Sequence, residues 1–414
     1  MEIESKKDDR MLTRRDVSKL LVTGGAGVAG SLLAASPLAA AKVSTSPLIN
    51  ARDYGAVGDG QTDDQPAIQA ALDSVGVHGG YVFLPAGRYL VGAPLFIKSK
   101  VNGAAGCVLG GSGQNCVITA GPGFPGNVAM LYILGGYAHV TDLGLDGADL
   151  AQNGIEYAYS SPDQPDDRTV SVSFVAFARM RSNGFHCVGG EIYQIRDCFF
   201  NSLGGYAVYS RDGGINSFVS GNYMLGCGGV YLGAVKMQPE GVRILNNTIL
   251  CSAGAGMGVY VEKGLEIQVS NNVIDQVKNS SIYVGGNSSY VKCTDNWLSA
   301  QNSNIACSVG QNANSITFIG NTFEGGSFQL SVAAQQLGDI HDVSICNNIF
   351  NNATDTAMFL DRATRVTIIG NHCRASGKES LFWGYGLHGI AMGNMLWKGP
   401  NAGKGLMQSN NIGW

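Results

Sequence analysis

The sequence predicts an all-β fold, a single-stranded right-handed parallel β-helix of about 11–12 coils with three strands per coil and a short N-terminal capping helix. One repeated asparagine and the lack of helix-length segments beside it support this prediction. The asparagine recurs at intervals of 25, 25, 24, 25, 27, 23 and 23 residues. A period of 20–50 residues is typical of solenoids, propellers and arrays. The repeated positions are Asn222, Asn247, Asn272, Asn296, Asn321, Asn348, Asn371 and Asn394.

Every repeat has the same local pattern, in which a short β-branched run precedes the asparagine and a second apolar run follows it. Three strand-like pieces, separated by Gly, Asn and Ser, fill each repeat. A propeller blade needs four strands and about 40 residues, so a three-strand coil fits this period better. We expect the asparagine to adopt the left-handed conformation at a turn and to bond its equivalents in neighbouring coils.

Composition agrees with a chain made mostly of strands and tight turns, with 59 Gly and 14% charged residues. The net charge of −4 gives no reason to expect a nucleic-acid partner, and an anionic polymer would have to meet local positive charge. Solenoids grow by stacking, so residues 42–414 are predicted to form one domain.

Residues 1–41 are predicted to be an export signal. Residues 13–19, TRRDVSK, resemble the twin-arginine motif, although Val17 and Ser18 stand where that motif more often has Phe and Leu. An apolar stretch at 20–33 and three alanines at 39–41 complete the signal. We expect a periplasmic or secreted protein with no membrane association after cleavage. Met1 and Met11 both remain possible starts.

Ten cysteines would suggest disulfides in an exported protein. They are scattered, mostly in strand-like runs, and no CxxC pair occurs, so we predict buried free thiols and no structural zinc. We expect no metal and no cofactor; calcium is possible but not indicated. The acidic insertion at 161–168 is predicted to be a protruding loop.

Residues 49–71, INARDYGAVGDGQTDDQPAIQAA, resemble the opening signature of the pectate-lyase-like superfamily, in particular its rhamnogalacturonase, polygalacturonase and epimerase-like branch. Residues 79–89, GGYVFLPAGRY, resemble the next element, so the capping signature covers 49–90. The resemblance implies a β-helix and a polysaccharide substrate rich in uronic acid. The Asn-Thr-Asp, Asp-Asp, Gly-His-Gly and Arg-Ile-Lys motifs of polygalacturonases are absent from the repeats.

The same segment has a structural role to fill. Asp63 or Asp64 is predicted to cap a short helix that has Pro66 in its first turn. Its apolar face consists of Ala67, Ile68, Ala71, Leu72 and Val75. Such a helix is suited to closing the open end of a solenoid.

Alignment of the coils brings one strand into register, with its second and fourth residues pointing outward. The second position holds Tyr209, Tyr231, Tyr260 and Tyr283. They should form an outer column with a spacing of about 4.8 Å. This column is a candidate platform for sugar rings. The alternative is an aromatic ladder that stabilises the sheet or lies under a loop or subunit interface.

Charged groups beside the column are the candidate catalytic residues, namely Arg211, Asp212, Lys236, Glu262 and Lys263. Arg211 and Glu262 lie two coils apart, about 9–10 Å. Asp212 and Glu262 would then approach the ~6.5–9.5 Å separation of an inverting glycosidase. In a lyase, Lys236 or Arg211 would remove the proton beside a uronate carboxylate. The alternative is ordinary solvated strand ends.

His186 is predicted to face outward one coil before Arg211 and to assist substrate binding. The leading hypothesis is an exported enzyme that cleaves or remodels an acidic polysaccharide, as a lyase or glycoside hydrolase. A non-catalytic glycan-binding protein and an epimerase or transferase on the same fold are the alternatives. The expected partner is a polysaccharide, and the expected state is a monomer or homotrimer.

Overall fold

A computed structural model describes residues 48–75, 79–98, 106–135, 137–158, 169–251, 256–300, 305–310, 312–385, 388–402 and 405–413. The predicted export signal and the acidic insertion at 161–168 lie outside these ranges. Within them, no helix is long and apolar enough to cross a membrane.

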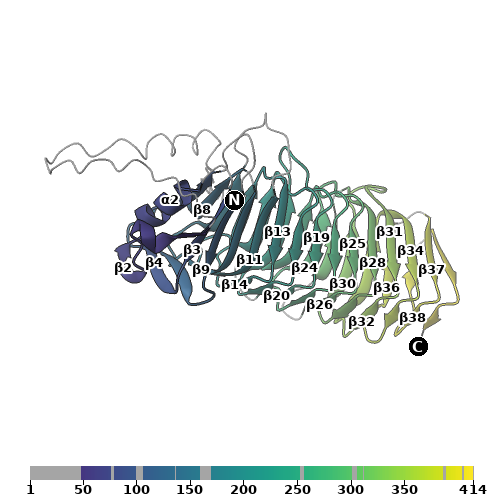
Figure 1. The fold of residues 1–414 in the computed structure, drawn as a ribbon. Coiled ribbons are helices and arrows are strands. Elements are labelled where there is room, and N and C mark those ends of the chain that lie inside the picture. Colours follow the sequence, from purple (N-terminus) through teal and green to yellow (C-terminus); the bar gives the residue numbers. More distant parts are fainter. Residues whose placement is uncertain are drawn as a thin grey trace, which may run out of the picture. The chain divides into compact units, whose positions relative to one another are not determined.

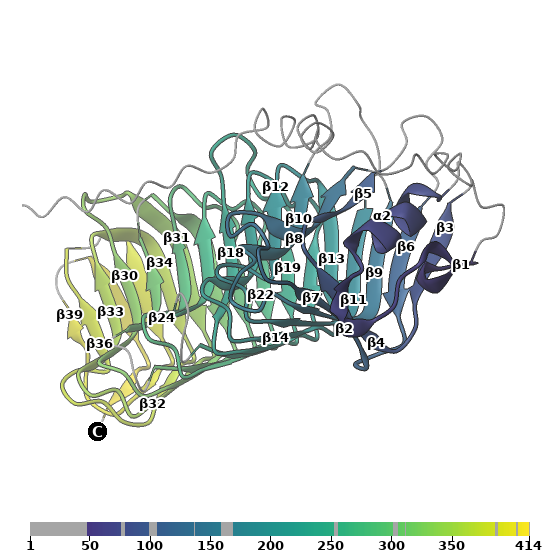
Figure 2. The same ribbon diagram turned by 90° about the vertical axis from the view of Figure 1, so that its left-hand side faces the viewer.

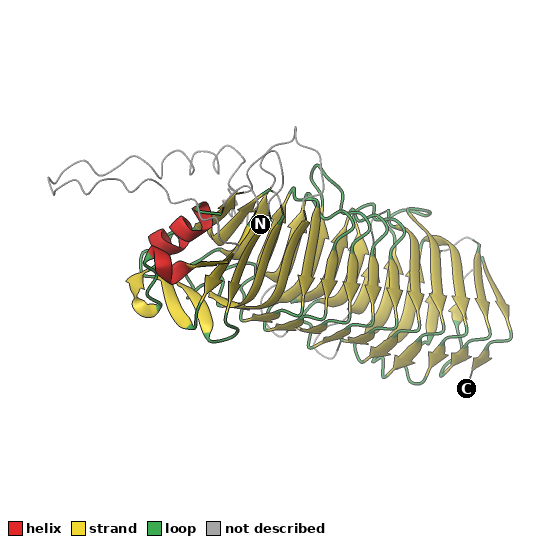
Figure 3. Ribbon diagram, in the orientation of Figure 1, coloured by secondary structure: helices red, strands yellow, loops and turns green. Residues whose placement is uncertain are grey.

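The predicted fold is confirmed as a right-handed parallel β-helix of about 12 turns (Figures 1 and 3). A typical coil contains three strands, as in β15 (Tyr206–Arg211), β16 (Phe218–Ser220) and β17 (Tyr223–Leu225). Each strand pairs in parallel with its equivalents in the coils before and after it. Short β-branched and apolar runs suit these strands because every second side chain enters the core.

One strand of each coil contributes to a sheet of 13 described strands, whose members lie side by side from β5 to β39 in Figure 2. The remaining members of that sheet are β5 (Leu95–Lys98), β8 (Ala129–Leu134), β10 (Asn153–Ala158), β12 (Phe185–Val188), β18 (Gly228–Gly233), β21 (Met257–Glu262), β24 (Ser280–Gly285), β27 (Ile305–Val309), β30 (Phe328–Ala333), β33 (Thr356–Asp361), β36 (Leu381–Trp383) and β39 (Asn401–Ala402).

The other two strands of each coil belong to a second, continuous sheet of 28 described strands. Besides β16 and β17, its members are β1 (Leu48–Asn50), β2 (Asp59–Asp63), β3 (Gly80–Leu84), β4 (Gly87–Val91), β6 (Cys107–Gly111), β7 (Cys116–Ala120), β9 (Ala138–Asp146), β11 (Thr169–Ala178), β13 (Ile192–Arg196), β14 (Phe199–Asn201), β19 (Arg243–Leu245), β20 (Thr248–Leu250), β22 (Gln268–Ser270), β23 (Val273–Asp275), β25 (Lys292–Thr294), β26 (Trp297–Ser299), β28 (Asn314–Ile319), β29 (Thr322–Glu324), β31 (Ile340–Cys346), β32 (Ile349–Asn351), β34 (Ala363–Ile369), β35 (His372–Cys373), β37 (Gly389–Met392), β38 (Met395–Leu396), β40 (Leu406–Ser409) and β41 (Ile412–Gly413).

The predicted capping helix is α2 (Gln65–Asp73), preceded by the 3₁₀ turn η1 (Ala51–Tyr54). It buries Ile68, Ala71 and Leu72. The predicted cap is confirmed in part, because Asp63 Oδ1 accepts the N–H of Gln65, the first residue of α2, at 3.1 Å. Asp64 holds the N-cap position, but its carboxylate accepts the N–H groups of Val57 and Gly58 rather than one from the helix. The carboxylate therefore fixes the loop before β2.

The asparagine ladder is present and is longer than predicted. In Asn272, for example, the side-chain Nδ2 donates to Asn296 Oδ1 at 3.0 Å and to the Ile244 carbonyl at 2.9 Å. The Asn247 backbone and side chain both donate to Asn272 Oδ1. The last described member is Asn411, which the period missed because it follows Asn394 by only 17 residues.

One expectation about the ladder is wrong. The left-handed backbone belongs to the residue before each ladder asparagine, such as Gly221, Asn246, Asn271 and Asp295, and not to the asparagine itself. The preceding residue makes the turn, and the ladder asparagine is thereby free to point inward and pair.

The core is apolar and includes aromatic stacks, such as Phe323 and Phe350 with ring centroids 4.6 Å apart. All ten cysteines are free, as predicted, and Cys346 alone is not fully buried. Burial raises the pKa of Cys107 to about 12 and that of Cys116 to about 11, so these thiols are neutral at physiological pH.

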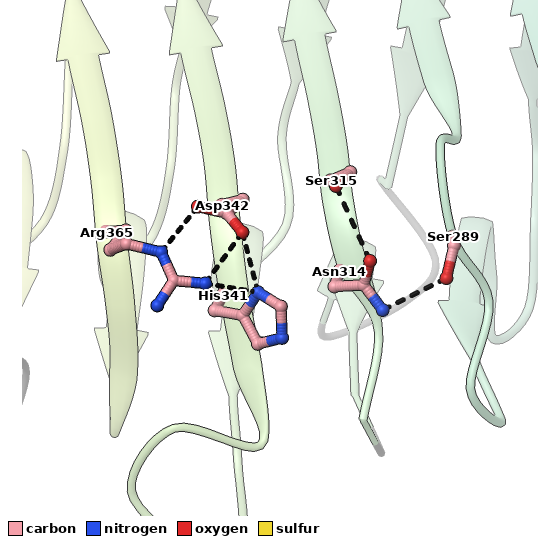
Figure 4. Close-up of polar contacts among 6 residues, drawn as sticks. All are labelled: Ser289, Asn314, Ser315, His341, Asp342 and Arg365. Carbon is pink, nitrogen blue, oxygen red and sulfur yellow. Dashed lines mark hydrogen bonds and ion pairs between the residues drawn. The ribbon is translucent and has the colours of Figure 1, made fainter.

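A polar cluster of His341, Asp342 and Arg365, hereafter the staple, links β31 to β34 (Figure 4). Arg365 donates from Nε to Asp342 Oδ1 at 2.7 Å and from Nη2 to Oδ2 at 2.8 Å. The His341 ring nitrogen Nδ1 lies 2.7 Å from the same carboxylate. Asp342 and Arg365 both have positive φ, so the staple fixes two stacked left-handed positions.

Candidate active site

The outward side chains of the 13-stranded sheet form a continuous column, with one residue from each coil. Strand register defines the column as Phe96, Tyr132, Glu156, His186, Tyr209, Tyr231, Tyr260 and Tyr283. Aromatic rings therefore flank Glu156 and His186, hereafter the acid–base pair, on both sides. The four predicted tyrosines, hereafter the tyrosine column, lie on the C-terminal side of that pair.

The tyrosine column is stacked as the sequence predicted. Successive ring centroids are 4.4, 5.2 and 4.6 Å apart, with interplanar angles of 9°, 11° and 19°. Because each ring covers the face of the next, the faces between them are occupied. Apart from the outer face of Tyr283, whose neighbour in the next coil is Ser308, the column therefore presents ring edges and phenol hydroxyls to solvent.

Two glycines shape the surface beside the phenol hydroxyls. A Cβ atom at Gly233 would lie 2.6 Å from the Tyr231 hydroxyl, and one at Gly285 would lie 2.2 Å from the Tyr283 hydroxyl. Glycine at these positions lets each ring lean along its own strand. A larger residue would have to displace the phenol.

Tyr206 is an aromatic member of the site that the sequence alignment did not identify. Its ring packs against Tyr209 at 5.9 Å and against Tyr231 at 5.5 Å. Tyr206 begins β15, three residues before Tyr209, and its partner in the next coil is Gly228, which leaves room for the ring.

The phenols of Tyr231, Tyr260 and Tyr283 have raised pKa values and remain protonated at neutral pH. Burial, followed by the neighbouring Tyr283 and Glu262, raises the pKa of Tyr260 to about 12. Burial is also the main cause of the raised pKa of Tyr231 and of Tyr283. These groups are therefore neutral hydrogen-bond donors and not bases.

The acid–base pair is enclosed and held from one side. His186 Nδ1 lies 3.2 Å from Glu156 Oε2, and Asn153 Nδ2 lies 3.2 Å from the same nitrogen and 3.3 Å from the carboxylate. Asn153 is fixed in turn, because its Oδ1 accepts two bonds from Asn183. His186 is only 9% exposed, so the predicted outward direction is correct but the ring is almost buried.

The second ring nitrogen of His186 has no partner among the described residues. His186 Nε2 is buried and makes no hydrogen bond. In the tautomer that donates Nδ1–H to Glu156, Nε2 carries the lone pair, which is the arrangement of a general base. The ring also meets Tyr209 edge-on, with centroids 5.3 Å apart and an angle of 66°.

Arg211 is the positive charge nearest this pair in the strand register. It lies in the coil after His186 and pairs with Val188. Val188 lies two residues after His186, and Arg211 lies two residues after Tyr209. Arg211 is partly exposed and forms no ion pair with any residue that the structure describes. Its guanidinium is therefore available to an external anion.

Glu262 occupies the strand position equivalent to Arg211, two residues after the tyrosine and two coils further on. Its Oε2 accepts the Tyr231 hydroxyl at 2.9 Å. Glu262 is three coils from His186, which at ~4.8 Å per coil is about 14 Å. The two groups cannot act on the same reacting carbon.

Three of the predicted catalytic residues lie around the loop that follows β18. The Asp212 carboxylate accepts the backbone N–H groups of Val235, Lys236 and Met237. Lys263 Nζ donates to the Ala234 carbonyl at 3.2 Å. Asp212 and Lys263 thus hold this loop from opposite sides, and the Lys236 side chain is exposed.

Among the described residues, no group of three or more His, Cys, Asp or Glu side chains is arranged to hold a metal ion. Sequence reasoning missed Glu156 and Asn153 because the insertion at 161–168 lengthens the interval between β10 and β12. A signal was available in the sequence. The segment Asn153-Gly154-Ile155-Glu156 matches Asn183-Gly184-Phe185-His186 residue by residue once the insertion is removed.

The fold and this outer face define the class: a right-handed β-helix with a polar centre and an aromatic column on one sheet. The family model "Rhamnogalacturonase A/epimerase, pectate lyase-like" matches residues 48–134, and the "Right handed beta helix region" model matches residues 148–298. The resemblance of this chain to the pectate-lyase-like proteins is confirmed over these residues.

Curated relatives match shorter stretches. Mannuronan C5-epimerases of Azotobacter vinelandii include AlgE1, 58% identical over 45 residues, and AlgE2, 32% identical over 187 residues. Alginate lyase 7 of the same organism is 48% identical over 60 residues. These matches cover 11%, 40% and 13% of the chain but only 3%, 18% and 7% of the respective relatives.

Among solved structures, the A-module of Azotobacter vinelandii mannuronan C5-epimerase AlgE6 is similar in fold. Its TM-score is 0.60, at 18% sequence identity, over 88% of this chain and 99% of the module. At that identity the likeness concerns the fold alone.

Proposed function

We propose that this protein is an exported enzyme that processes a uronate-containing polysaccharide by removing the proton beside the uronate carboxylate. This step is shared by polysaccharide lyases and C5-epimerases. The observation that carries the proposal is His186, which lies beside an aromatic column and one coil before Arg211. Among the described residues, His186 Nε2 is buried without a hydrogen-bond partner and Arg211 forms no ion pair.

The residues have complementary roles in this reaction. Because Nε2 is buried in the free protein, substrate binding must first uncover it. His186 Nε2 then accepts the C5 proton while Glu156 stabilises the resulting imidazolium through Nδ1. The electron pair of the C5–H bond moves into the carboxylate, and Arg211 neutralises the charge that develops there. Tyr209 contacts the His186 ring and is positioned to hold the reacting sugar.

The intermediate then has two outcomes. If the bond from C4 to the glycosidic oxygen breaks, and that oxygen takes a proton, the product is an unsaturated uronate and the enzyme is a lyase. If C5 takes a proton from the opposite face, the product is the C5 epimer. Relatives bearing both kinds of name, mannuronan C5-epimerase and alginate lyase, support this shared first step.

Hydrolysis by the predicted pair Asp212 and Glu262 has less support. Oδ1 of Asp212 accepts three backbone N–H groups, so this carboxylate holds the loop after β18. Glu262 accepts the Tyr231 hydroxyl. We therefore assign Asp212, Lys236 and Lys263 to shaping the face and Glu262 to binding.

The test is incubation of the mature protein with polyuronates and neutral polysaccharides in D₂O. Ultraviolet absorbance reports unsaturated ends, a colorimetric assay reports reducing ends, and NMR reports deuterium at C5. Unsaturated ends indicate a lyase, and deuterium with inverted C5 indicates an epimerase. Reducing ends without either, or binding without any conversion, would contradict the proposal and favour a hydrolase or a glycan-binding protein.

A further inference from the structure

We infer that His186 lies at the closed end of a one-sided row of subsites, so that the enzyme acts near one end of its glycan. The following sugars are held by phenol hydroxyls rather than by ring stacking. The first half of this inference rests on the proposed function, because it takes His186 as the reaction centre. The second half concerns binding and can be tested separately.

The N-terminal side of His186 is closed. The neighbouring column position, Glu156, has a side chain only 13% exposed. Tyr132, one coil further, is 2% exposed, and its hydroxyl accepts the Ala129 backbone N–H. Its ring is stacked on Phe96 at 5.3 Å. A sugar at the level of the column therefore has little surface to contact beyond Glu156.

The C-terminal side is open. The hydroxyls of Tyr209, Tyr260 and Tyr283 are not enclosed and make no hydrogen bond with any described residue, whereas that of Tyr231 is held by Glu262. All four residues are partly exposed. Free, protonated phenols in a row are donors for the hydroxyl and carboxylate oxygens of a glycan.

Stacking within the column decides how a sugar is held. Ring faces separated by 4.4–5.2 Å leave no space for a sugar between them. A pyranose therefore meets ring edges and hydroxyls. One coil advances by ~4.8 Å, close to the advance of one sugar along an extended chain, so each sugar lies beside about one ring of the column. The hydroxyls of Tyr209, Tyr260 and Tyr283 are the donors, since Glu262 already holds that of Tyr231.

The first experiment locates the reaction on the chain. Hexa-uronates labelled at one end are incubated with the enzyme in D₂O, and tandem mass spectrometry finds the sugar that gains deuterium or unsaturation. We expect the first change within one or two sugars of a single chain end. A change spread evenly over internal sugars would overturn the one-sided arrangement.

The second experiment separates hydroxyl donation from stacking. Tyr283→Phe keeps the ring and removes the donor, so it should weaken binding of a hexamer about two- to tenfold, the effect of one neutral hydrogen bond. It should leave a dimer unaffected. Tyr283→Ala should lose at least as much, and Tyr223→Phe, an exposed tyrosine of the other sheet, should lose nothing.

Full hexamer affinity in Tyr283→Phe with a loss in Tyr283→Ala would overturn hydroxyl donation in favour of ring contact. Calorimetric titration gives these affinities whether or not conversion occurs. A wild type that binds hexamers through Tyr283 but converts none would contradict the proposed function alone. A wild type that binds no oligouronate would overturn both proposals.

Discussion

Tyr231 and Glu262 are joined across adjacent coils, because the phenol hydroxyl of Tyr231 donates a 2.9 Å hydrogen bond to Glu262 Oε2. The bond uses the one hydroxyl of the tyrosine column that is not available to a ligand. It also fixes a carboxylate on the face about 14 Å from His186. Under the proposed function, Glu262 therefore belongs to the binding surface and not to the proton-transfer centre.

Glu262→Gln tests this separation. If His186 is the reaction centre, the substitution should leave kcat within about threefold of the wild type and change KM, because a neutral amide replaces a fixed negative charge near an anionic polymer. Steady-state kinetics on a polyuronate measure both constants. A 100-fold fall in kcat would instead place the chemistry at Glu262, as the sequence analysis predicted.

The tyrosine column predicts a loss of stability at high pH. The pKa of Tyr260 is raised from 10.0 to about 12 in the folded protein, so folding favours the protonated phenol. This contribution is fully present below pH 10 and is lost as the pH rises toward 12. Thermal unfolding and phenolate absorbance should therefore change together in this window. Phenolate formation by Tyr260 near pH 10 without loss of structure, judged against Tyr260→Phe, would refute the raised pKa.

Asn272→Leu should cost about 3 kcal/mol or more of unfolding free energy. The change removes the acceptor of two bonds from Asn247 and leaves the Ile244 carbonyl without its side-chain donor, all in a buried position. Gln268→Leu in the same coil is the control, because Gln268 points outward from β22. Denaturant unfolding measures both. Equal stabilities of the two variants would show that the ladder contributes nothing.

The staple at β31 and β34 predicts an acid-dependent effect (Figure 4). The Arg365 hydrogen bonds, followed by His341, lower the pKa of Asp342 from 3.8 to about 2. Its contribution is present above pH 3.8 and is lost as the pH falls toward 2. Asp342→Asn should therefore reduce stability at pH 6 by up to about 1 kcal/mol, since both partners are exposed, and by much less below pH 2.

Glu240→Gln, at an exposed position that forms isolated β-bridges with Ile215 and Leu265 outside the named strands, should show no such pH dependence. A constant difference between Asp342→Asn and the wild type at both pH values would mean that the substitution acts through packing rather than charge.

The sequence predicted the repeat, the tyrosine column and its register, because strict periodicity fixes which side chains point outward. The sequence analysis assigned the left-handed conformation to the ladder asparagine, whereas the residue before it adopts that conformation. Asparagine is suited both to a left-handed turn and to an inward-facing ladder, so residue type alone does not distinguish the two positions. Glu156 escaped because it precedes an insertion, and the burial of His186 depends on neighbours that periodicity does not reveal. The contacts of Asp212 with the loop after β18 are set by tertiary structure. The sequence therefore showed Asp212 only as a charged residue beside the tyrosine column.

Transfer of deuterium to C5 by the wild type and by His186→Gln tests the central claim most directly. Both proteins are incubated with the same oligouronate in D₂O, after circular dichroism and thermal unfolding have confirmed equal folding. General-base catalysis contributes about 10²–10⁴-fold, so the variant should exchange or eliminate at least 100-fold more slowly at unchanged substrate affinity. Wild-type rates in His186→Gln would contradict the assignment of the reaction to this residue.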